Sequence, residues 1–434
     1  MNNKLGIRRW IALLVAGFVG QLAWAIENNY LNLYAFYCTQ DYIYIPLMTA
    51  FSAVTATIVT LLMGALSDRL GKRKIFISLG YIIWGISIIL FAFLDPHNNI
   101  TIVNNSVVLA GSLIVIMDCV MTFFGSTAND AAFNASVTEI TNTDNRGKVE
   151  SVLSILPLIA MIAVVVIGGI FVDGDNKRWD IFFYLFGGIT ILAGIVCLFL
   201  YPKDVASPNR AENYFKNIFY GMRPSVIRKN NLLYLSLIVF MVFNIGIQIF
   251  MPYLMVYIQQ GLGIQGVDFT VALGVVLVVS SILVVVVGLF MDKIGKNKII
   301  FPALEITIAG GVMMAFADNQ KGVIIGGTVL MTGYLVSTAV FGAKVRDYTP
   351  VEKAGLFQGV RMVFVVLIPM VTGPYIGRGV SYINAKTYVN EYNQTVIQPN
   401  GFIFLFTSII LLLAIIPVII LLKKEKAQNE TTTD

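Results

Sequence analysis

The chain has 434 residues, of which 57% are hydrophobic and only 12% are charged. Soluble proteins carry about a quarter of charged residues, so this composition excludes an ordinary soluble domain. The net charge of +6 does not indicate nucleic-acid binding, because the basic residues lie in short segments between long apolar runs. The three cysteines are far apart and the single His97 falls in a connecting segment, so we expect no disulfide framework, no metal site and no cofactor.

Long apolar runs dominate the chain. A membrane-spanning helix needs about 20 mostly apolar residues, and twelve runs meet that requirement. They are too long for the strands of a membrane barrel and do not alternate apolar with polar residues. We therefore predict an all-α membrane protein with twelve transmembrane helices. The predicted spans are 9–37, 43–66, 75–94, 106–133, 150–172, 179–201, 231–258, 267–290, 299–317, 322–343, 356–380 and 401–422.

The distribution of lysine and arginine predicts the orientation. If the N-terminus is cytoplasmic, 24 of the 30 basic residues fall in inner segments and five in outer ones, while Arg361 alone lies inside a span. Basic residues concentrate on the cytoplasmic side of membrane proteins. We therefore expect a multi-pass protein of the cytoplasmic membrane with both termini inside.

The longest inner connection, 202–230, contains three prolines and separates the sixth span from the seventh. We take it as a cytoplasmic linker between an N-terminal six-helix bundle at 1–201 and a C-terminal bundle at 231–423. Its basic residues are expected to lie near anionic lipid. Residues 424–434 form a predicted cytoplasmic tail, whose acidic, threonine-rich part from Glu425 is expected to be disordered.

The first span carries an unusual row of polar side chains. At 100° per residue, Gln21, Trp24, Asn28 and Asn32 fall within about 80° of arc, with Glu27 on the flank. Such a stripe does not face lipid. It either makes hydrogen bonds to neighbouring helices or forms a polar wall with an aromatic platform that suits a hydroxylated solute.

The fourth span carries acidic residues at membrane depth. Asp118 shares a face with Thr122 and Asn129, and these three are candidates for solute binding, while Asp130 lies on another face nearer the cytoplasm. Burial without a counter-charge favours the protonated form of a carboxyl group. Glu27, Asp118 and Asp130 are therefore candidate proton carriers, although Asp130 also suits a structural bond to a neighbouring loop.

The seventh span mirrors the first. Asn244 and Gln248 lie one turn apart, so they are candidates for the opposite wall of a solute site. Pro252, a few residues later, is expected to break or kink the span.

A short basic turn occurs twice. Gly64 to Lys74 reads GALSDRLGKRK, and Gly288 to Lys298 reads GLFMDKIGKNK, a constant shift of 224 positions. Two apolar helices joined by such a turn, once per half, resemble the major facilitator superfamily of transporters. That resemblance implies two pseudo-symmetric six-helix bundles and an inner gate at the turn. The implied gate residues are Gly64, Asp68, Arg69, Gly71, Arg73, Asp292, Lys293 and Gly295.

Two stretches resemble one branch of that superfamily. Trp24 to Tyr34 and Asp130 to Thr141 are similar to the first and fourth helices of the glycoside-pentoside-hexuronide symporters, typified by melibiose permease, and of the sucrose:proton symporters. In that group carboxylates on these two helices take part in sugar binding, which implies such a role for Glu27 and Asp130. The two aspartates that sodium-coupled members carry on helix two have no counterpart at Thr55 to Thr60, so proton coupling is favoured.

These patterns predict a secondary active transporter, not an enzyme, that moves a sugar or glycoside with protons by alternating access. Its expected partners are the solute, protons and membrane lipid, and we expect a monomer. The alternative is a proton-driven exporter of drugs or amphipathic metabolites on the same fold. A sensor or membrane-embedded enzyme is disfavoured because no catalytic dyad, metal cluster or soluble output domain is visible.

Overall fold

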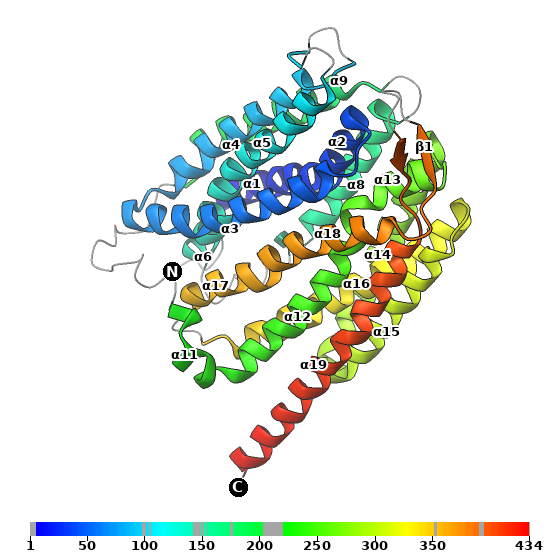
Figure 1. Cartoon of the computed structure of the whole chain (residues 1–434). Coiled ribbons are helices and arrows are strands. Elements are labelled where there is room, and N and C mark those ends of the chain that lie inside the picture. Colours follow the sequence, from blue (N-terminus) through cyan, green and yellow to red (C-terminus); the bar gives the residue numbers. More distant parts are fainter. Residues whose placement is uncertain are drawn as a thin grey trace. The chain divides into compact units, whose positions relative to one another are not determined.

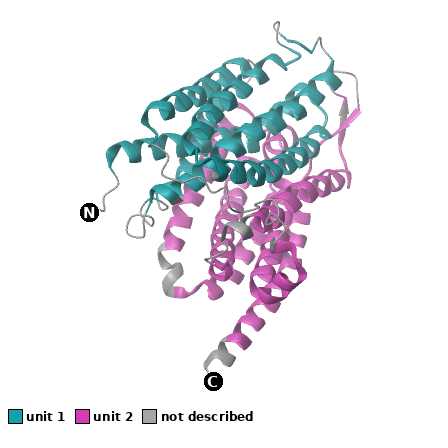
Figure 2. Ribbon diagram, turned by 90° about the vertical axis from the view of Figure 1, so that its left-hand side faces the viewer, with its two compact units in different colours: residues 1–215 teal, residues 216–434 magenta. Residues whose placement is uncertain are grey.

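The computed structural model describes residues 6–97, 101–103, 106–141, 149, 152–153, 155–173, 177–202, 220–350, 354–389 and 395–433. At residues 68, 138, 220, 289–293, 354–356, 358, 388 and 429–433 it describes the backbone only. The chain divides into two compact units, residues 1–215 and 216–434 (Figure 2). Both units consist of long apolar helices, in agreement with the predicted helical class.

The helices of unit 1 are labelled in Figure 1. In its first and fourth spans, the α-helix continues through a π-helical segment. Its elements are α1 (Ile7–Ala25), η1 (Ile26–Tyr30), α2 (Leu31–Thr39), α3 (Tyr44–Leu70), α4 (Arg73–Leu90), η2 (Phe91–Phe93), α5 (Val107–Gly125), η3 (Ser126–Phe133), α6 (Asn134–Ile140), α8 (Leu156–Phe171) and α9 (Trp179–Leu200).

Unit 2 contains the second set of long helices and one small hairpin. Its elements are η4 (Tyr220–Met222), α11 (Pro224–Lys229), α12 (Asn231–Phe250), η5 (Met251–Tyr253), α13 (Leu254–Val256), η6 (Tyr257–Gly261), α14 (Gly266–Ile294), α15 (Lys296–Ala315), α16 (Gln320–Tyr348), α17 (Ala354–Met362), η8 (Val363–Leu367), α18 (Ile368–Ser381), β1 (Thr387–Val389), β2 (Thr395–Ile397) and α19 (Phe402–Thr433).

The membrane-crossing helices follow the apolar runs of the sequence. Within the described residues, eleven helices are long and apolar enough to cross a bilayer. The shorter apolar helix α8 lies where the sequence predicts the span 150–172. Some observed helix ends agree closely with the predicted span ends. The span predicted at 179–201, for example, is α9, Trp179–Leu200.

Glycines allow the helices of unit 1 to approach closely. A Cβ atom built on Gly187 of α9 would lie 2.7 Å from the Gly85 carbonyl oxygen of α4, and one built on Gly194 would lie 2.7 Å from the Ser78 carbonyl oxygen. Small residues at helix interfaces let backbones meet and so stabilise membrane bundles by van der Waals packing. The α4–α9 interface is therefore sensitive to a single added methyl group.

A substitution pair tests that interface. Gly187→Ala should destabilise the protein by about 1 to 3 kcal/mol, because the methyl group has no room against the Gly85 carbonyl. The adjacent Gly188 is a matched control, since a Cβ there meets nothing within 4 Å. Thermal unfolding in detergent should show a lower Tm for Gly187→Ala and an unchanged or raised Tm for Gly188→Ala. Equal Tm values would mean that the helices relax at no cost.

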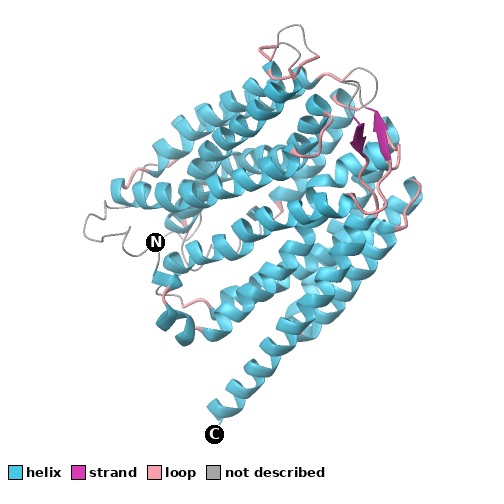
Figure 3. Ribbon diagram, viewed as in Figure 1, coloured by secondary structure: helices cyan, strands magenta, loops and turns pink. Residues whose placement is uncertain are grey.

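Two features of unit 2 interrupt the helical pattern. Pro252, predicted to break its span, lies in the 3₁₀ turn η5 directly after α12 ends at Phe250. The strands β1 and β2 pair antiparallel between α18 and α19 (Figure 3). The sequence analysis predicted only a connecting segment there. The β-branched and aromatic residues of Thr387–Val389 and Thr395–Ile397 favour the strands that form.

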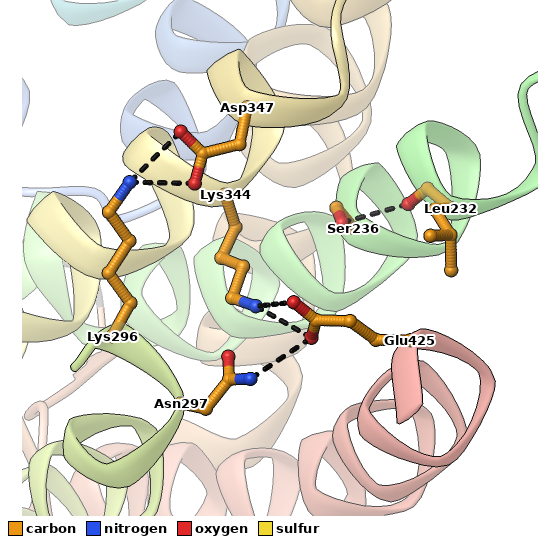
Figure 4. Close-up of polar contacts among 7 residues, drawn as sticks. All are labelled: Leu232, Ser236, Lys296, Asn297, Lys344, Asp347 and Glu425. Atoms are coloured by element: carbon orange, nitrogen blue, oxygen red, sulfur yellow. Dashed lines mark hydrogen bonds and ion pairs between the residues drawn. The ribbon is translucent and has the colours of Figure 1, made fainter. Parts of the chain in front are cut away.

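The expectation of a disordered tail from Glu425 is wrong, because α19 continues to Thr433. Glu425 accepts hydrogen bonds from Lys344 Nζ of α16 at 2.7 and 2.8 Å, and from Asn297 Nδ2 of α15 at 3.2 Å (Figure 4). Lys344 is buried, with 4% of its side chain exposed. A buried ammonium group needs a counter-charge, so Glu425 fixes this part of the helix.

We expect Glu425→Ala to lower the Tm measurably. The loss should be about 2 kcal/mol, less than that for a fully buried pair because Glu425 is partly exposed. Lys424→Ala is the matched control, since Lys424 makes one exposed 3.3 Å bond to Asn231. If both variants have the Tm of the wild type, Lys344 finds another partner and Glu425 does not stabilise the structure.

Candidate functional site

The main polar site of unit 1 surrounds Glu27. This residue lies in η1 and is 6% exposed. Its Oε1 accepts hydrogen bonds of 2.8 Å from Ser52 Oγ of α3 and from Thr122 Oγ1 of α5, and the two hydroxyl oxygens are also 2.8 Å apart. The carboxyl group therefore joins three helices within the core of one unit.

Asp118 completes this site. It lies one turn before Thr122 on α5 and is 1% exposed, and Glu27 acts electrostatically on it. Its Oδ1 has no hydrogen-bond partner among the described residues, and neither has Oε2 of Glu27. We call Glu27, Ser52, Asp118 and Thr122 the carboxyl pocket. Among the described ion pairs, none neutralises either carboxyl group.

A second polar group lies beside the pocket. Trp24 Nε1 donates to Asn129 Oδ1 at 3.2 Å, and Asn129 Nδ2 donates to the Tyr81 hydroxyl at 2.8 Å. The Trp24 ring meets the buried Trp84 ring with centroids 5.1 Å apart. We call Trp24, Tyr81, Trp84 and Asn129 the Trp24–Asn129 group. It places aromatic rings beside an amide, and solute binding by Trp24 and Asn129 stays a prediction.

Gly125 makes room for the two indole rings. A Cβ atom there would lie 2.7 Å from Trp84 Cζ2 and 3.1 Å from Trp24 Cη2. Gly20 of α1 similarly packs against the side chains of Asn129 and Tyr81. These close approaches fix the ring positions, because packed interiors tolerate little added volume.

Two π-helical segments place the polar residues. Glu27 lies in η1 and Asn129 in η3, in the middle of otherwise α-helical spans. A π-helical turn adds a residue to the turn and shifts the faces of the helix that follow, and such segments are frequent at functional sites. The 100° wheel drawn over the first span therefore does not hold beyond Ala25, which explains why Glu27 points into the core.

The remaining predicted residues of the first and fourth spans have varied surroundings. Asn28 is exposed and Gln21 half-buried, whereas Asn32 is buried. The side chains of Asn28 and Asn32 each donate to the carbonyl oxygen four residues earlier. Asp130 accepts a 3.0 Å bond from Ser126 within η3 and acts electrostatically on Glu27.

In unit 2, the two candidate residues face neighbouring helices. Asn244 Nδ2 donates to the Val365 carbonyl oxygen of η8 at 3.1 Å. Gln248 is half-buried, and a Cβ atom placed on Gly373 of α18 would lie 2.5 Å from the Gln248 Cβ. Both residues therefore lie at the side of α12 that packs against η8 and α18.

The turn between α3 and α4 has a defined geometry. Gly71 ends α3 with φ 61°, a left-handed conformation that suits glycine. Arg73, which is buried, donates to Glu139 Oε1 of α6 at 3.0 and 3.1 Å and also to Ser67 Oγ. Of the other predicted gate residues in this turn, Gly64 is half-buried and Arg69 exposed, and the Asp68 side chain lies outside the described residues.

The corresponding turn of unit 2 is similar in part. Gly295 has φ 91°, again a conformation that favours glycine. Lys296 pairs with Asp347 at the end of α16 at 2.6 Å (Figure 4). The side chains of Asp292 and Lys293 lie outside the described residues.

Several residues of the site escaped the sequence analysis. Ser52 lies among other hydroxyl residues of an apolar run. Tyr81 and Trp84 resemble the ordinary packing residues of the apolar run that contains them. The spacing of three between Tyr81 and Trp84, about one helical turn, is the signal that these two share a face. Within the described residues, no group of three or more His, Cys, Asp or Glu could hold a metal ion.

Long apolar helices around buried carboxyl and amide groups define a polytopic membrane protein with an internal polar site. The sequence model of the Major Facilitator Superfamily matches residues 9–374. The chain therefore belongs to the Major Facilitator Superfamily and is a transporter of that type.

A curated relative gives a shorter match. Over 144 residues the chain is 28% identical to the inner membrane transport protein YajR of Escherichia coli K12. The match covers 32% of this chain and 31% of YajR, so the chain spans about a third of the length of this relative.

Solved structures match over nearly the whole chain. A mutant form of the nucleoside transporter NupG has a TM-score of 0.72 at 11% identity, and the match covers 95% of this chain and 99% of the NupG chain. A D-xylose–proton symporter has a TM-score of 0.69 at 15% identity, covering 94% and 97%. At these identities the likeness concerns the fold alone.

Proposed function

We propose that the chain is a secondary active transporter that moves a sugar or glycoside with protons across the cytoplasmic membrane. In this proposal the protein has twelve spans in two pseudo-symmetric bundles, 1–201 and 231–423, joined by the linker 202–230, with both ends cytoplasmic. It works as a monomer by alternating access.

One observation carries the proposal. Glu27, held by Ser52 and Thr122 and interacting electrostatically with the buried carboxyl group of Asp118, lies one turn from Trp24. Ionisable residues at membrane depth are costly and mark ion or solute paths. An aromatic platform next to an amide suits a hydroxylated ring, because its apolar face can stack while its hydroxyl groups bond. The first span thus carries both an aromatic platform for the solute and a carboxyl group that can exchange a proton.

The comparisons support the same solute class. The titles of the similar structures name a D-xylose–proton symporter and a nucleoside transporter, whose solutes both contain a sugar ring. The inner membrane transport protein YajR supports location in the cytoplasmic membrane. In this proposal the inner turns, with Arg73 bound to Glu139, act as the cytoplasmic gate.

Uptake into proteoliposomes tests the proposal. A panel of labelled sugars, glycosides and nucleosides is offered with an imposed pH gradient, with and without a protonophore. We expect at least one sugar-containing solute to accumulate above its outside concentration, and the protonophore to remove that accumulation. If no panel member accumulates while amphipathic dyes are moved against their gradient, the exporter alternative replaces this proposal.

A further inference from the structure

The single histidine of the chain lies in a polar and aromatic cluster at one end of unit 1. His97 follows η2 in the segment that leads to α5, and 33% of its side chain is exposed. Its backbone N–H donates to Asp95 Oδ1 at 2.9 Å, and its Nδ1 lies 3.1 Å from the same oxygen. The Asp95 side chain is buried, with 8% exposed. A buried carboxylate favours a cationic neighbour, because a low dielectric strengthens the attraction between the two charges.

Tyr37 joins this cluster to two other segments. It lies in α2, near the end of the first span, and its ring centroid is 5.0 Å from that of His97. Lys177, which precedes α9, places Nζ 5.0 Å from the centre of the Tyr37 ring, and the ring of Trp179 at the start of α9 is 5.9 Å away. An aromatic face attracts a cation. The cluster therefore ties the end of the first span to the segment before α5 and to the start of α9.

The charged groups around His97 act on its ring in opposite directions. Asp95 favours the imidazolium form, and the ammonium group of Lys177 opposes it. The carboxylate contacts the imidazole directly at 3.1 Å, whereas the ammonium group lies 5.0 Å from the centre of the tyrosine ring that both residues approach. Because the interaction between charges weakens with distance, the effect of Asp95 is the larger. Tyr34 and Cys38 of α2, on which Asp95 also acts, are uncharged at neutral pH.

We propose that protonation of His97 closes a pH-sensitive latch that holds the end of the first span. The latch consists of Tyr37, Asp95, His97 and Lys177. The imidazolium form makes a charge-assisted bond to Asp95 and a cation–π contact with Tyr37, and the neutral ring makes weaker forms of both. The inference goes beyond the proposed function and rests on it for the orientation, which places this end of unit 1 outside the cell. Because the first span also carries Trp24, acid outside should slow the movement of the solute platform.

NMR tests the pairing directly, because the chain has one histidine. In the purified full-length protein, the signals of an isotope-labelled histidine ring are followed from pH 5 to 9. The wild-type ring should keep its proton to a higher pH than the ring in Asp95→Asn does. Asp318→Asn, which removes an exposed carboxyl group between α15 and α16, is the matched control and should titrate as the wild type does. Equal titration curves for the wild type and a folded Asp95→Asn protein would overturn the proposal.

Stability measurements test the latch without altering the buried carboxylate. His97→Gln should lower the Tm below a pH of about 6.5, where the histidine of the unfolded chain is also charged. The difference from the wild type should disappear as the pH rises and the folded protein loses the imidazolium charge. Tyr37→Leu keeps the pair of Asp95 and His97 but removes the cation–π contact, so it should show part of the same loss. A Tm difference that does not depend on pH would mean that His97 acts by packing alone, and the switch would be refuted.

Counterflow measures the effect on the first span. With equal pH on both sides, lowering the pH from 8 to 6 should slow solute exchange about twofold or more in the wild type relative to His97→Gln. Equal slowing in the two proteins would remove the latch from the control of transport. Failure of the proposed function is recognised separately. If the histidine titration and the Tm differences map to the latch but no sugar-containing solute accumulates, the latch stands and the assigned solute class does not.

Discussion

Glu27→Gln should abolish accumulation of the solute against its gradient while leaving solute exchange across the membrane. The glutamine side chain is isosteric, and its carbonyl oxygen can still accept the bonds from Ser52 and Thr122. It can no longer exchange a proton. A pH gradient of about one unit supplies roughly 1.4 kcal/mol per proton, enough for about tenfold accumulation in the wild type. The variant should only equilibrate the solute, as measured by labelled uptake into proteoliposomes.

The control for this prediction is Glu305→Gln, which removes an exposed carboxyl group from unit 2 and should accumulate solute as the wild type does. Counterflow, in which unlabelled solute inside drives entry of labelled solute, shows that the variant remains folded and open to solute. Wild-type accumulation by Glu27→Gln would remove this residue from the coupling mechanism.

Trp24→Ala should weaken solute binding about fivefold to thirtyfold without uncoupling transport. The indole ring supplies an aromatic face, worth about 1 to 2 kcal/mol in stacking and lost packing, which is roughly a fivefold to thirtyfold change in Kd. Trp24→Phe keeps a ring but loses the hydrogen bond to Asn129, so its loss should be about 1 kcal/mol. Equilibrium binding of the solute found in the uptake panel measures both changes.

Trp10→Ala, at the start of α1 and away from the site, is the matched control and should bind solute normally. In Trp24→Phe, the ratio of the solute concentration inside the proteoliposomes to that outside should equal the wild-type ratio once the solute concentration exceeds the raised Kd. A Trp24→Ala protein with unchanged affinity would place the solute elsewhere in the molecule.

The sequence predicted the helical class and most of the span positions, because apolar length is a direct requirement of the bilayer. It did not predict the partner of Glu27. Hydroxyl residues such as Thr49 and Thr57 of α3 bond the carbonyl oxygen four residues earlier in their own helix. Nothing in the local pattern distinguishes Ser52, whose hydroxyl group instead reaches another helix. Partner choice between helices depends on packing, which a single sequence does not display.

The π-helical turns were also beyond prediction. The polar residues of η1, Ile26–Tyr30, mark a site in the first span, but they do not reveal a change in the backbone hydrogen-bond pattern. The π-helical turn keeps the backbone hydrogen-bonded while it changes the direction of the side chains. The prediction for the tail was wrong for a related reason. Its polar composition alone suggests disorder, but the buried ammonium group of Lys344 requires Glu425 as its partner.

The paired indole rings of Trp24 and Trp84 give the protein an intrinsic optical probe. The chain has only four tryptophans, and these two have ring centroids 5.1 Å apart beside the carboxyl pocket. Replacing the remote Trp10 and Trp179 by phenylalanine would leave emission from the pair alone. A solute stacking on Trp24 would then change the fluorescence directly, so that its occupancy could be followed in real time without a label.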